Sequence, residues 1–104
     1  MTVSADLSRD ELIRSLRLLE PSLRAKGVTG LAIFGSRSRG DHRPDSDLDI
    51  LIDVDAGAKN PLYVAFDAQH VVHDALGLET QASLRSELRD RIAVRVADDL
   101  IRIF

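Results

Sequence analysis

The sequence predicts a small α+β domain in which a mixed sheet of about three strands is flanked by helices. Apolar residues recur at helical spacing at both ends and in the middle of the chain, and two short apolar runs between these segments are typical of strands. The expected order is helix, strand, strand, helix, short strand, helix, without internal repeats or linkers. With 104 residues and no cysteine, the chain is expected to fold as one domain, residues 1–104, around a single hydrophobic core.

The first part of the chain predicts a helix followed by a buried strand. Ser8 and Glu11 have the spacing of a capping box, and leucines then recur at helical intervals. Pro21 is expected to kink or restart this helix because proline has no backbone N–H, and Gly27 is expected to end it. Residues 30–34, Gly-Leu-Ala-Ile-Phe, form a short apolar run that predicts a buried strand.

A second strand is predicted over residues 47–54, with two chemically different faces. The apolar residues at every second position from Leu48 to Val54 would face the core, because side chains alternate along a strand. The acidic residues on the other face are Asp47, Asp49 and Asp53.

The second half of the chain predicts a long helix, a short strand and a final helix. Asn60 followed by Pro61 is a typical helix start, and Gly77 is expected to end that helix. Residues 78–82 are long enough only for a short strand, and apolar residues then recur every four positions over residues 84–100. The apolar side of the long helix is predicted to contain Leu62, Ala65, Phe66, Val72 and Leu76.

Composition restricts the class of protein. The formal net charge of −3 argues against a protein that mainly grips nucleic-acid phosphates, which requires a basic surface. Apolar runs are far shorter than the roughly 18 residues of a membrane-spanning helix. Residues 1–6 show no basic segment followed by an apolar core, so a cytoplasmic location is expected.

A glycine-bracketed turn and a pair of carboxylates lie close together in the middle of the chain. Residues 35–40, Gly-Ser-Arg-Ser-Arg-Gly, directly follow the first predicted strand. Glycine lets the backbone approach a phosphate closely, while hydroxyls, turn N–H groups and arginines can bind its oxygens. Asp47 and Asp49 should point to one side of the next strand, where a cation would relieve their repulsion. Mg²⁺ combines carboxylates with substrate phosphates, so the pattern indicates phosphoryl or nucleotidyl transfer.

The sequence does not support three other site types. Residues 35–40 have the glycine spacing of a P-loop, but residues 41–42 are Asp-His where Lys-Ser/Thr is required. Residues 45–49 have the alternating aspartates of an EF-hand loop, but isoleucine follows where that loop requires glycine. His70 and His73 lie one helical turn apart without an evident third ligand, which is weak support for zinc.

The combined motif resembles the signature of the polymerase-beta-like nucleotidyltransferase superfamily. That signature has Gly-Ser and a second glycine, a short loop, and Ser-Asp-x-Asp on a strand; here it corresponds to residues 35–40 and 46–49. The approach Arg-Pro-Asp-Ser-Asp at residues 43–47 and the stretch at 84–92 are similar to minimal members of the superfamily. The resemblance extends from about Leu12 to Ile92 and implies the nucleotidyltransferase fold.

The resemblance also implies a role for each residue of the motif. Gly35 and Ser36 would cradle the nucleotide triphosphate, while Asp47 and Asp49 would act in catalysis by holding one or two Mg²⁺ ions. The further residues expected near the nucleotide are Arg37, Arg39, Gly40 and Ser46.

A third carboxylate completes the metal site in the family and can help to activate the acceptor hydroxyl. It lies on the strand that follows the next helix, and in this sequence that segment is short and polar. Glu79 is the best candidate by position for this catalytic and metal-binding role, and Asp74 is a less favoured one closer to the helix end.

The activity implied by the resemblance is the Mg²⁺-dependent transfer of a nucleoside monophosphate to a hydroxyl, with ATP or another nucleoside triphosphate as donor. Minimal members commonly pair with HEPN-domain toxins, and the nucleotidyltransferase is then the antitoxin that adenylylates a tyrosine of the toxin. The alternative is a binding module that keeps the fold and neutralises a partner by contact, without chemistry. The short polar segment around Glu79 motivates that alternative.

Overall fold

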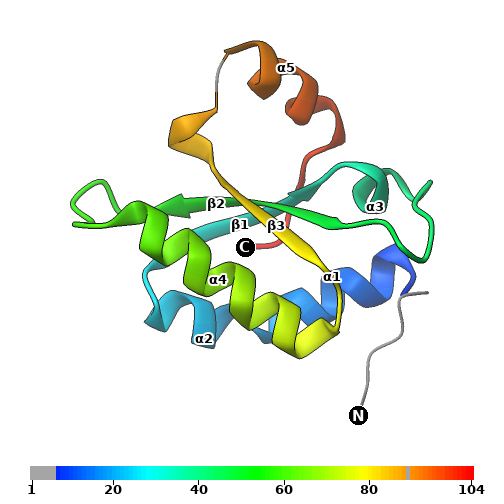
Figure 1. Cartoon of the computed structure of the whole chain (residues 1–104), viewed down its shortest axis with the longest axis horizontal. Coiled ribbons are helices and arrows are strands. Elements are labelled where there is room, and N and C mark those ends of the chain that lie inside the picture. Colours follow the sequence, from blue (N-terminus) through cyan, green and yellow to red (C-terminus); the bar gives the residue numbers. More distant parts are fainter. Residues whose placement is uncertain (1–6, 89) are drawn as a thin grey trace.

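The computed structural model describes residues 7–88 and 90–104, and Figure 1 shows how their elements are arranged. A four-stranded mixed sheet is flanked by helices, which confirms the predicted α+β class. No helix in the described ranges is long and apolar enough to cross a membrane. The elements in chain order are α1 (Arg9–Leu18), α2 (Glu20–Ala25), β1 (Val28–Phe34), α3 (Ser36–Arg39), β2 (Leu48–Val54), α4 (Pro61–Leu76), β3 (Thr80–Leu84), η1 (Arg85–Glu87), α5 (Asp90–Asp99) and β4 (Ile101–Arg102).

Local sequence explains the first two helices. The Ser8 hydroxyl accepts a hydrogen bond from the Glu11 N–H at 3.2 Å, and the Glu11 carboxylate accepts one from the Ser8 N–H at 3.4 Å. The helix restarts at α2 with Pro21 in the first turn, where its missing N–H costs nothing. Gly27, with φ +107°, follows α2, and its N–H donates to the Arg24 carbonyl at 3.1 Å.

The sheet has the strand order β3-β2-β1-β4. β1 pairs antiparallel with β2 and β4, whereas β2 and β3 run parallel and are connected through α4. In this register Asp49 of β2 lies between Phe34, the last residue of β1, and Gln81 of β3. The two-residue β4 is the strand that the sequence prediction of about three strands lacks.

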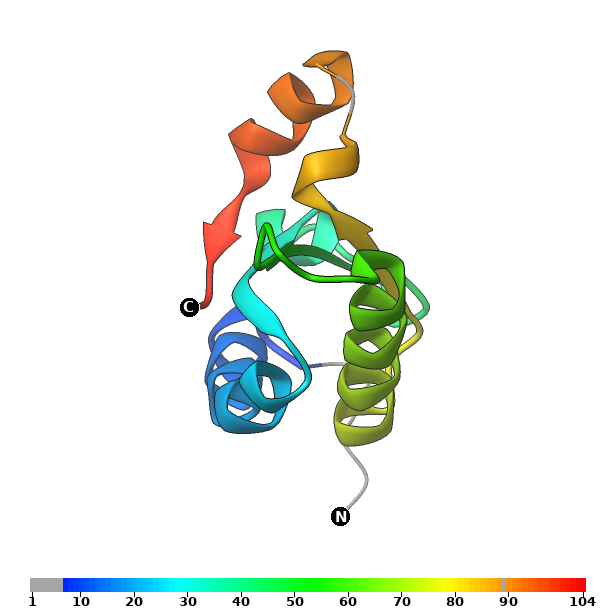
Figure 2. The ribbon, with the colours of Figure 1, turned by 90° about the vertical axis from the view of Figure 1, so that its left-hand side faces the viewer.

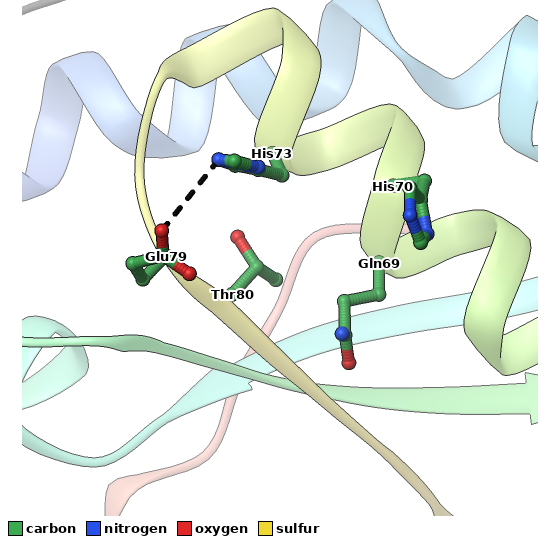
Figure 3. Close-up of a pocket in the computed structure, with 5 residues that line it drawn as sticks. All are labelled: Gln69, His70, His73, Glu79 and Thr80. Atoms are coloured by element: carbon green, nitrogen blue, oxygen red, sulfur yellow. Dashed lines mark ion pairs between the residues drawn. The ribbon is translucent and has the colours of Figure 1, made fainter.

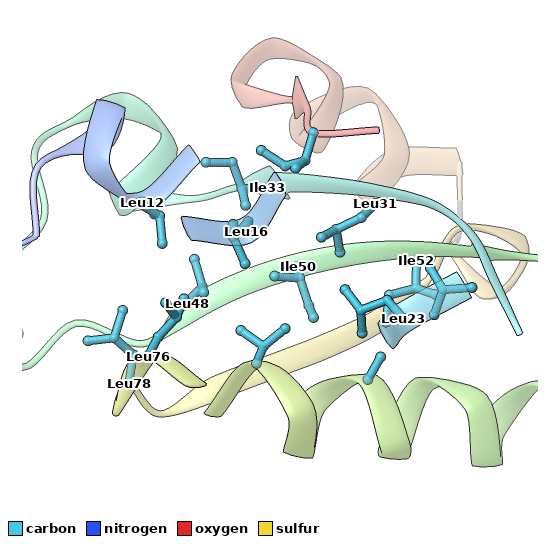
Figure 4. Close-up of a cluster of buried hydrophobic side chains, with 14 of the residues drawn as sticks. Leu12, Leu16, Leu23, Leu31, Ile33, Leu48, Ile50, Ile52, Leu76 and Leu78 are labelled. Carbon is cyan, nitrogen blue, oxygen red and sulfur yellow. The ribbon is translucent and has the colours of Figure 1, made fainter. Parts of the chain in front are cut away.

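Alternating side chains separate two apolar layers. Figure 2 shows α1, α2 and α4 on one side of the sheet, and η1 and α5 on the other. The main core lies on the first side, where Ile33 of β1 and Ile50 of β2 meet Leu12, Leu16 and other helical residues (Figure 4). The predicted apolar face of β2 is therefore confirmed. The small cluster on the other side contains Ala32, Leu51 and Val96.

The predicted apolar side of α4 is only partly correct. Ala65 and Val72 are buried, but Leu62 and Phe66 are 69% and 58% exposed, and so is their neighbour Tyr63 at 66%. Each residue turns roughly 100° around the helix axis from the one before it. Since Ala65 faces the sheet, Phe66 is directed to the side, and the small alanines let the helix lie close to the strands.

The final helix starts later than predicted. Leu84 belongs to β3, where it is the parallel neighbour of Ile52, and α5 begins only at Asp90. Pairing with β2 provides hydrogen-bond partners for the backbone of the segment up to Leu84. This tertiary context overrides the helical periodicity of residues 84–100 at its start. Leu88 packs against the small cluster from outside any helix.

Candidate active site

Asp47 and Asp49 flank the first residue of β2 on the side of the sheet away from the main core. Leu48 between them is fully buried in that core. Asp49 is half-buried and Asp47 is exposed, and the charge of Asp47 acts on Asp49. Because side chains alternate along the backbone, both carboxylates are available on one side, as the sequence predicts.

Asp53 shares this face of β2 but has a different environment. Its Oδ1 accepts a hydrogen bond from Arg85 Nε of η1 at 2.7 Å, which makes an ion pair near the other end of the strand. A Cβ at Gly30 of β1 would lie 2.8 Å from the other carboxylate oxygen of Asp53, so β1 and this side chain approach closely. The structure thus places Asp53 in a local ion pair with Arg85.

Gly35 brings the backbone into direct contact with the Asp49 carboxylate. Phe34, the residue before it, is the sheet partner of Asp49, so Gly35 leaves β1 beside that side chain. A Cβ at Gly35 would lie 2.5 Å from Asp49 Oδ2, closer than real side chains come. With φ +80° and ψ −161°, the backbone also has a conformation that is essentially restricted to glycine. The turn and the carboxylate thus form one site.

Residues 36–39 form a single helical turn rather than an irregular loop. Gly35 precedes α3, and Gly40 ends it in the left-handed conformation with φ +85°. The Gly40 and Asp41 N–H groups donate to the Ser36 carbonyl at 2.9 and 3.1 Å, which is a common way to end a helix at glycine. The two glycines of the motif therefore have conformational roles, and the turn presents Ser36 next to Asp49.

The electrostatics of Asp49 reflect its confined position. Partial burial raises the pKa of Asp49 above the ordinary aspartate value, and the nearby Asp47 charge raises it further. Arg39 acts in the opposite direction. A cation between the two carboxylates would remove the repulsion that disfavours their charged forms.

Arg39 is exposed near the carboxylates and is held by two acidic residues. Its Nε donates to Asp41 at 3.1 Å, and its Nη1 donates to Asp99 at the end of α5 at 2.8 Å. These carboxylates, Asp41 first, raise the pKa of Arg39 above its ordinary value. The Ser38 hydroxyl also donates to the Asp99 carbonyl, so α3 and the end of α5 are tied together.

Arg37 does not lie where the sequence led us to expect it. Its side chain is 1% exposed, with Nε donating to the Ser46 carbonyl at 3.0 Å and Nη2 to the Pro44 carbonyl at 3.3 Å. The guanidinium therefore faces the loop before β2 instead of the solvent side of the turn. Ser46 is also engaged in this loop, because its hydroxyl accepts from the Arg43 N–H at 2.9 Å. Both residues organise the loop that carries Asp47.

Figure 3 shows the Glu79 carboxylate directed toward His73 of α4. It is exposed, and its Oε1 lies 3.9 Å from His73 Nε2. The two residues line a cavity of about 180 Å³ with Gln69, His70 and Thr80. Within the described ranges no three His, Asp or Glu side chains are placed to hold a metal ion. Among the described residues, Glu79 is therefore paired with His73 and not grouped with Asp47 and Asp49 around a metal site, and His70 and His73 have no third ligand.

Gln81, and not the predicted Glu79, is the residue of β3 that lies beside Asp49. It is the parallel neighbour of Asp49, so the two side chains share one face of the sheet. Thr80, one residue earlier, is buried on the opposite face beside Leu48. The sequence suggests Glu79 because it is the acidic residue of this segment. Alternation of Thr80, Ala82 and Leu84 toward the core places Gln81 on the face of Asp49, and the strand register makes the two neighbours.

Comparisons with known proteins show the family of the chain. Residues 15–103 match the family model of the nucleotidyltransferase domain. The chain is 30% identical over 101 residues to a protein adenylyltransferase, MntA, of Thermococcus cleftensis, which covers 95% of this chain and 99% of the relative.

Solved structures share the fold. One described as a minimal nucleotidyltransferase superposes with a TM-score of 0.74 at 28% identity, covering 92% of this chain and 96% of that one. A second, the complex of the tri-AMPylated HEPN toxin of Shewanella oneidensis with its MNT antitoxin, contains a chain with a TM-score of 0.62 at 14% identity. That match covers 88% of this chain and 71% of the other, and it shows similarity of fold alone.

Proposed function

The chain belongs to the nucleotidyltransferase domain family, and from this premise we propose that it transfers a nucleoside monophosphate, AMP from ATP, to a hydroxyl of a partner protein. One observation carries the proposal: the backbone of Gly35 lies against the Asp49 carboxylate, with no room for a side chain between them. A glycine turn in contact with a carboxylate pair can hold phosphate and cation next to each other.

The donor set fits a magnesium ion. Asp47 and Asp49 supply two carboxylates on one side of β2, and Mg²⁺ typically takes one or two carboxylates together with water and substrate phosphates. Burial and, after it, repulsion by Asp47 raise the pKa of Asp49, and a bound cation would relieve that repulsion. Bound Mg²⁺ would neutralise charge that develops on the phosphates during transfer.

The chain's own residues would bind and orient the nucleotide. The Ser36 hydroxyl and the N–H groups of the turn would donate to phosphate oxygens, and the exposed Arg39 would add a charge-assisted contact. The acceptor oxygen then forms a bond to the α-phosphorus as the bond to the β-phosphate oxygen breaks. Pyrophosphate leaves, and the acceptor hydroxyl gives up its proton.

The acceptor that we propose is a tyrosine hydroxyl of a HEPN-domain toxin, which makes this chain an antitoxin. Two similarities support this partner. The Thermococcus cleftensis relative is called a protein adenylyltransferase, and the Shewanella oneidensis complex pairs an antitoxin of this fold with an AMPylated HEPN toxin. The protein surface of a partner would also supply recognition that a domain of this size has little room for.

Label transfer from ATP tests this function. The chain is incubated with Mg²⁺, ATP labelled at the α-phosphate, and the candidate toxin encoded by the neighbouring gene. We expect label on the toxin, and no label with the double variant Asp47→Asn, Asp49→Asn, which keeps the shape of both side chains but removes their charges.

Asp53→Asn is the matched control, because Asp53 lies on the same face of the same strand but is paired with Arg85. This variant should keep most of the transfer. If the toxin remains unlabelled with the unsubstituted chain, or if the double variant transfers label equally well, the proposed activity is wrong.

A second candidate function is inhibition of a partner by binding alone. The observation in its favour is Gln81, a neutral amide beside Asp49 where a further acidic ligand would strengthen a metal site. Calorimetry with the purified partner separates the two functions. Tight binding and full inhibition without ATP, unaffected by Asp49→Asn, would support the binding module, whereas inhibition that requires both supports the transferase.

A further inference from the structure

We propose that Arg37 is a positioning residue of the active site, whose buried guanidinium fixes the loop before β2 and so holds Asp47 and Asp49 against the Gly35 turn. This inference rests on the proposed function and assigns a role that the motif itself does not reveal. It starts from the burial of Arg37, which is 1% exposed and the largest fully buried side chain in the described ranges. Arginine is almost never fully buried unless its charge is engaged.

The hydrogen bonds of Arg37 connect the two halves of the site. Arg37 belongs to α3, one residue after Ser36, while two of its acceptors are the carbonyls of Ser46 and Pro44, at 3.0 and 3.3 Å. Ser46 directly precedes Asp47. One side chain thus joins the turn that would bind phosphate to the segment that would bind metal.

The loop between Gly40 and Leu48 contains a hydrogen-bonded turn. Arg43 and Ser46 form a closed turn, because the Ser46 N–H donates to the Arg43 carbonyl at 3.0 Å and the Arg43 N–H donates to the Ser46 hydroxyl at 2.9 Å. Most other side chains between Gly40 and Leu48 are exposed and add little packing. The Arg37 hydrogen bonds are therefore expected to contribute much of what holds this turn in place.

The other end of the connection is anchored. The carbonyl of Ser38, next to Arg37, accepts from Arg9 Nη1 of α1 at 3.2 Å, and the Ser38 hydroxyl donates to the Asp99 carbonyl at the end of α5. α3 is therefore fixed to two helices, and Arg37 transmits that fixed position to the loop.

The chemistry of the side chain explains why arginine stands here. Its planar guanidinium presents several N–H donors in a rigid fork, which matches two carbonyls of one loop. A lysine at this position keeps the charge, but its N–H donors all lie on one rotating ammonium nitrogen and cannot reproduce the fixed fork. Arg37→Lys thus removes the fork while keeping a cation of similar length.

The test compares Mn²⁺ binding by the unsubstituted chain, Arg37→Lys and Val72→Ala, measured by calorimetry in the presence of a non-hydrolysable ATP analogue. Val72 is fully buried in the main core, so Val72→Ala lowers stability without touching the site. Loss of a residue that orients metal ligands typically costs roughly 10- to 100-fold in metal affinity. We expect a loss of that size for Arg37→Lys and unchanged Mn²⁺ affinity for Val72→Ala.

Amide hydrogen exchange over residues 43–48 without metal gives a readout that does not depend on the proposed function. Faster exchange in Arg37→Lys but not in Val72→Ala supports the positioning role. Equal exchange, or equal Mn²⁺ affinity in a chain that binds Mn²⁺, overturns it. An unsubstituted chain that binds no Mn²⁺ refutes the proposed function, while exchange still decides whether Arg37 holds the loop.

If Arg37→Lys does not fold, Ser46→Ala tests the same loop from its other side. This variant removes the acceptor of the Arg43 N–H and leaves the buried charge in place. We expect faster exchange in residues 43–48 and a severalfold loss of Mn²⁺ affinity. Unchanged values for both would overturn the inference, because the geometry of the loop would then not control the carboxylates.

Discussion

Replacing Gly35 with alanine tests the contact between the turn and the Asp49 carboxylate directly. The new Cβ would lie 2.5 Å from Asp49 Oδ2 and 3.4 Å from its Cγ, so the carboxylate or the turn must shift. Alanine would also have to adopt φ +80° with ψ −161°, a region essentially limited to glycine. The close contact and the backbone strain should both destabilise the folded state and disturb the proposed metal site.

The expected cost follows from these two terms. Backbone strain of this kind costs about 1–3 kcal/mol, and overpacking adds about 1–3 kcal/mol. Gly40→Ala is the matched control, because Gly40 also has a positive φ of +85° but no atom lies within 4 Å of its added Cβ. Its cost should be the left-handed strain alone, about 1–2 kcal/mol.

Thermal unfolding followed by circular dichroism measures the difference. In a domain of this size 1 kcal/mol lowers the melting temperature by roughly 4–8 °C, so Gly35→Ala should melt well below Gly40→Ala. Repeating both substitutions in an Asp49→Ala background completes the comparison. Removal of the carboxylate should reduce the stability cost of Gly35→Ala by about 1 kcal/mol or more and leave the cost of Gly40→Ala unchanged.

Equal losses of stability in the two glycine variants, with neither loss changed in the Asp49→Ala background, would contradict a contact between the turn and the carboxylate. The backbone conformation would then account for the whole cost, and the turn would not press on the carboxylate. A loss of Mn²⁺ affinity in Gly35→Ala that is absent in Gly40→Ala would separately link this contact to the metal site.

Three further predictions concern charges around the site. Burial raises the pKa of Asp49, so the charged carboxylate opposes folding at a pH above that pKa. Asp49→Asn removes this charge and should therefore raise the melting temperature of the metal-free chain at pH 7. That gain should vanish below about pH 4, where aspartate is protonated in the unfolded chain as well, and a gain that persists there would contradict the pKa argument. Gln81→Glu places a third carboxylate beside Asp49 and should tighten Mn²⁺ binding about tenfold or more by calorimetry; an unchanged dissociation constant would mean that Gln81 does not face the metal. Asp99→Asn frees Arg39 Nη1 from an ion pair of 2.8 Å and should improve binding of an ATP analogue severalfold, whereas weaker binding would show that the pair preorganises Arg39.

The core of the candidate site could be predicted because its chemistry is local. Alternation along β2 fixes which face Asp47 and Asp49 share, and the glycine bracket around residues 36–39 indicates a special backbone. Neither inference depends on distant parts of the chain. Both are consistent with the structure, where Gly35 contacts Asp49 directly.

The prediction of Glu79 as a third carboxylate shows what local sequence alone cannot provide. An acidic residue near the start of the third strand is the natural candidate by position, yet the parallel register places Gln81 beside Asp49, and the Glu79 carboxylate lies near His73. The register between β2 and β3 depends on how α4 packs, and it decides which residue of β3 lies beside Asp49. The sequence alone does not contain that packing.

The two arginines of the motif illustrate the same limit. Arg37 and Arg39 are two positions apart in one turn, and composition gives both the same expected role. The structure buries Arg37 against loop carbonyls and exposes Arg39 between Asp41 and Asp99. On a helical turn, positions two apart point in very different directions, so the location of the core decides which arginine is available to a ligand.

By itself, the sequence determined the α+β class, the two faces of β2 and the pairing of a glycine turn with carboxylates. These features follow from periodicity and from backbone conformations that only certain residues tolerate. Only the tertiary structure decided that Gln81 is the neighbour of Asp49, that Arg37 holds the loop, and that the final helix is shortened by strand pairing. Each of these depends on contacts between segments that are far apart in the chain, where burial and register outweigh local preference.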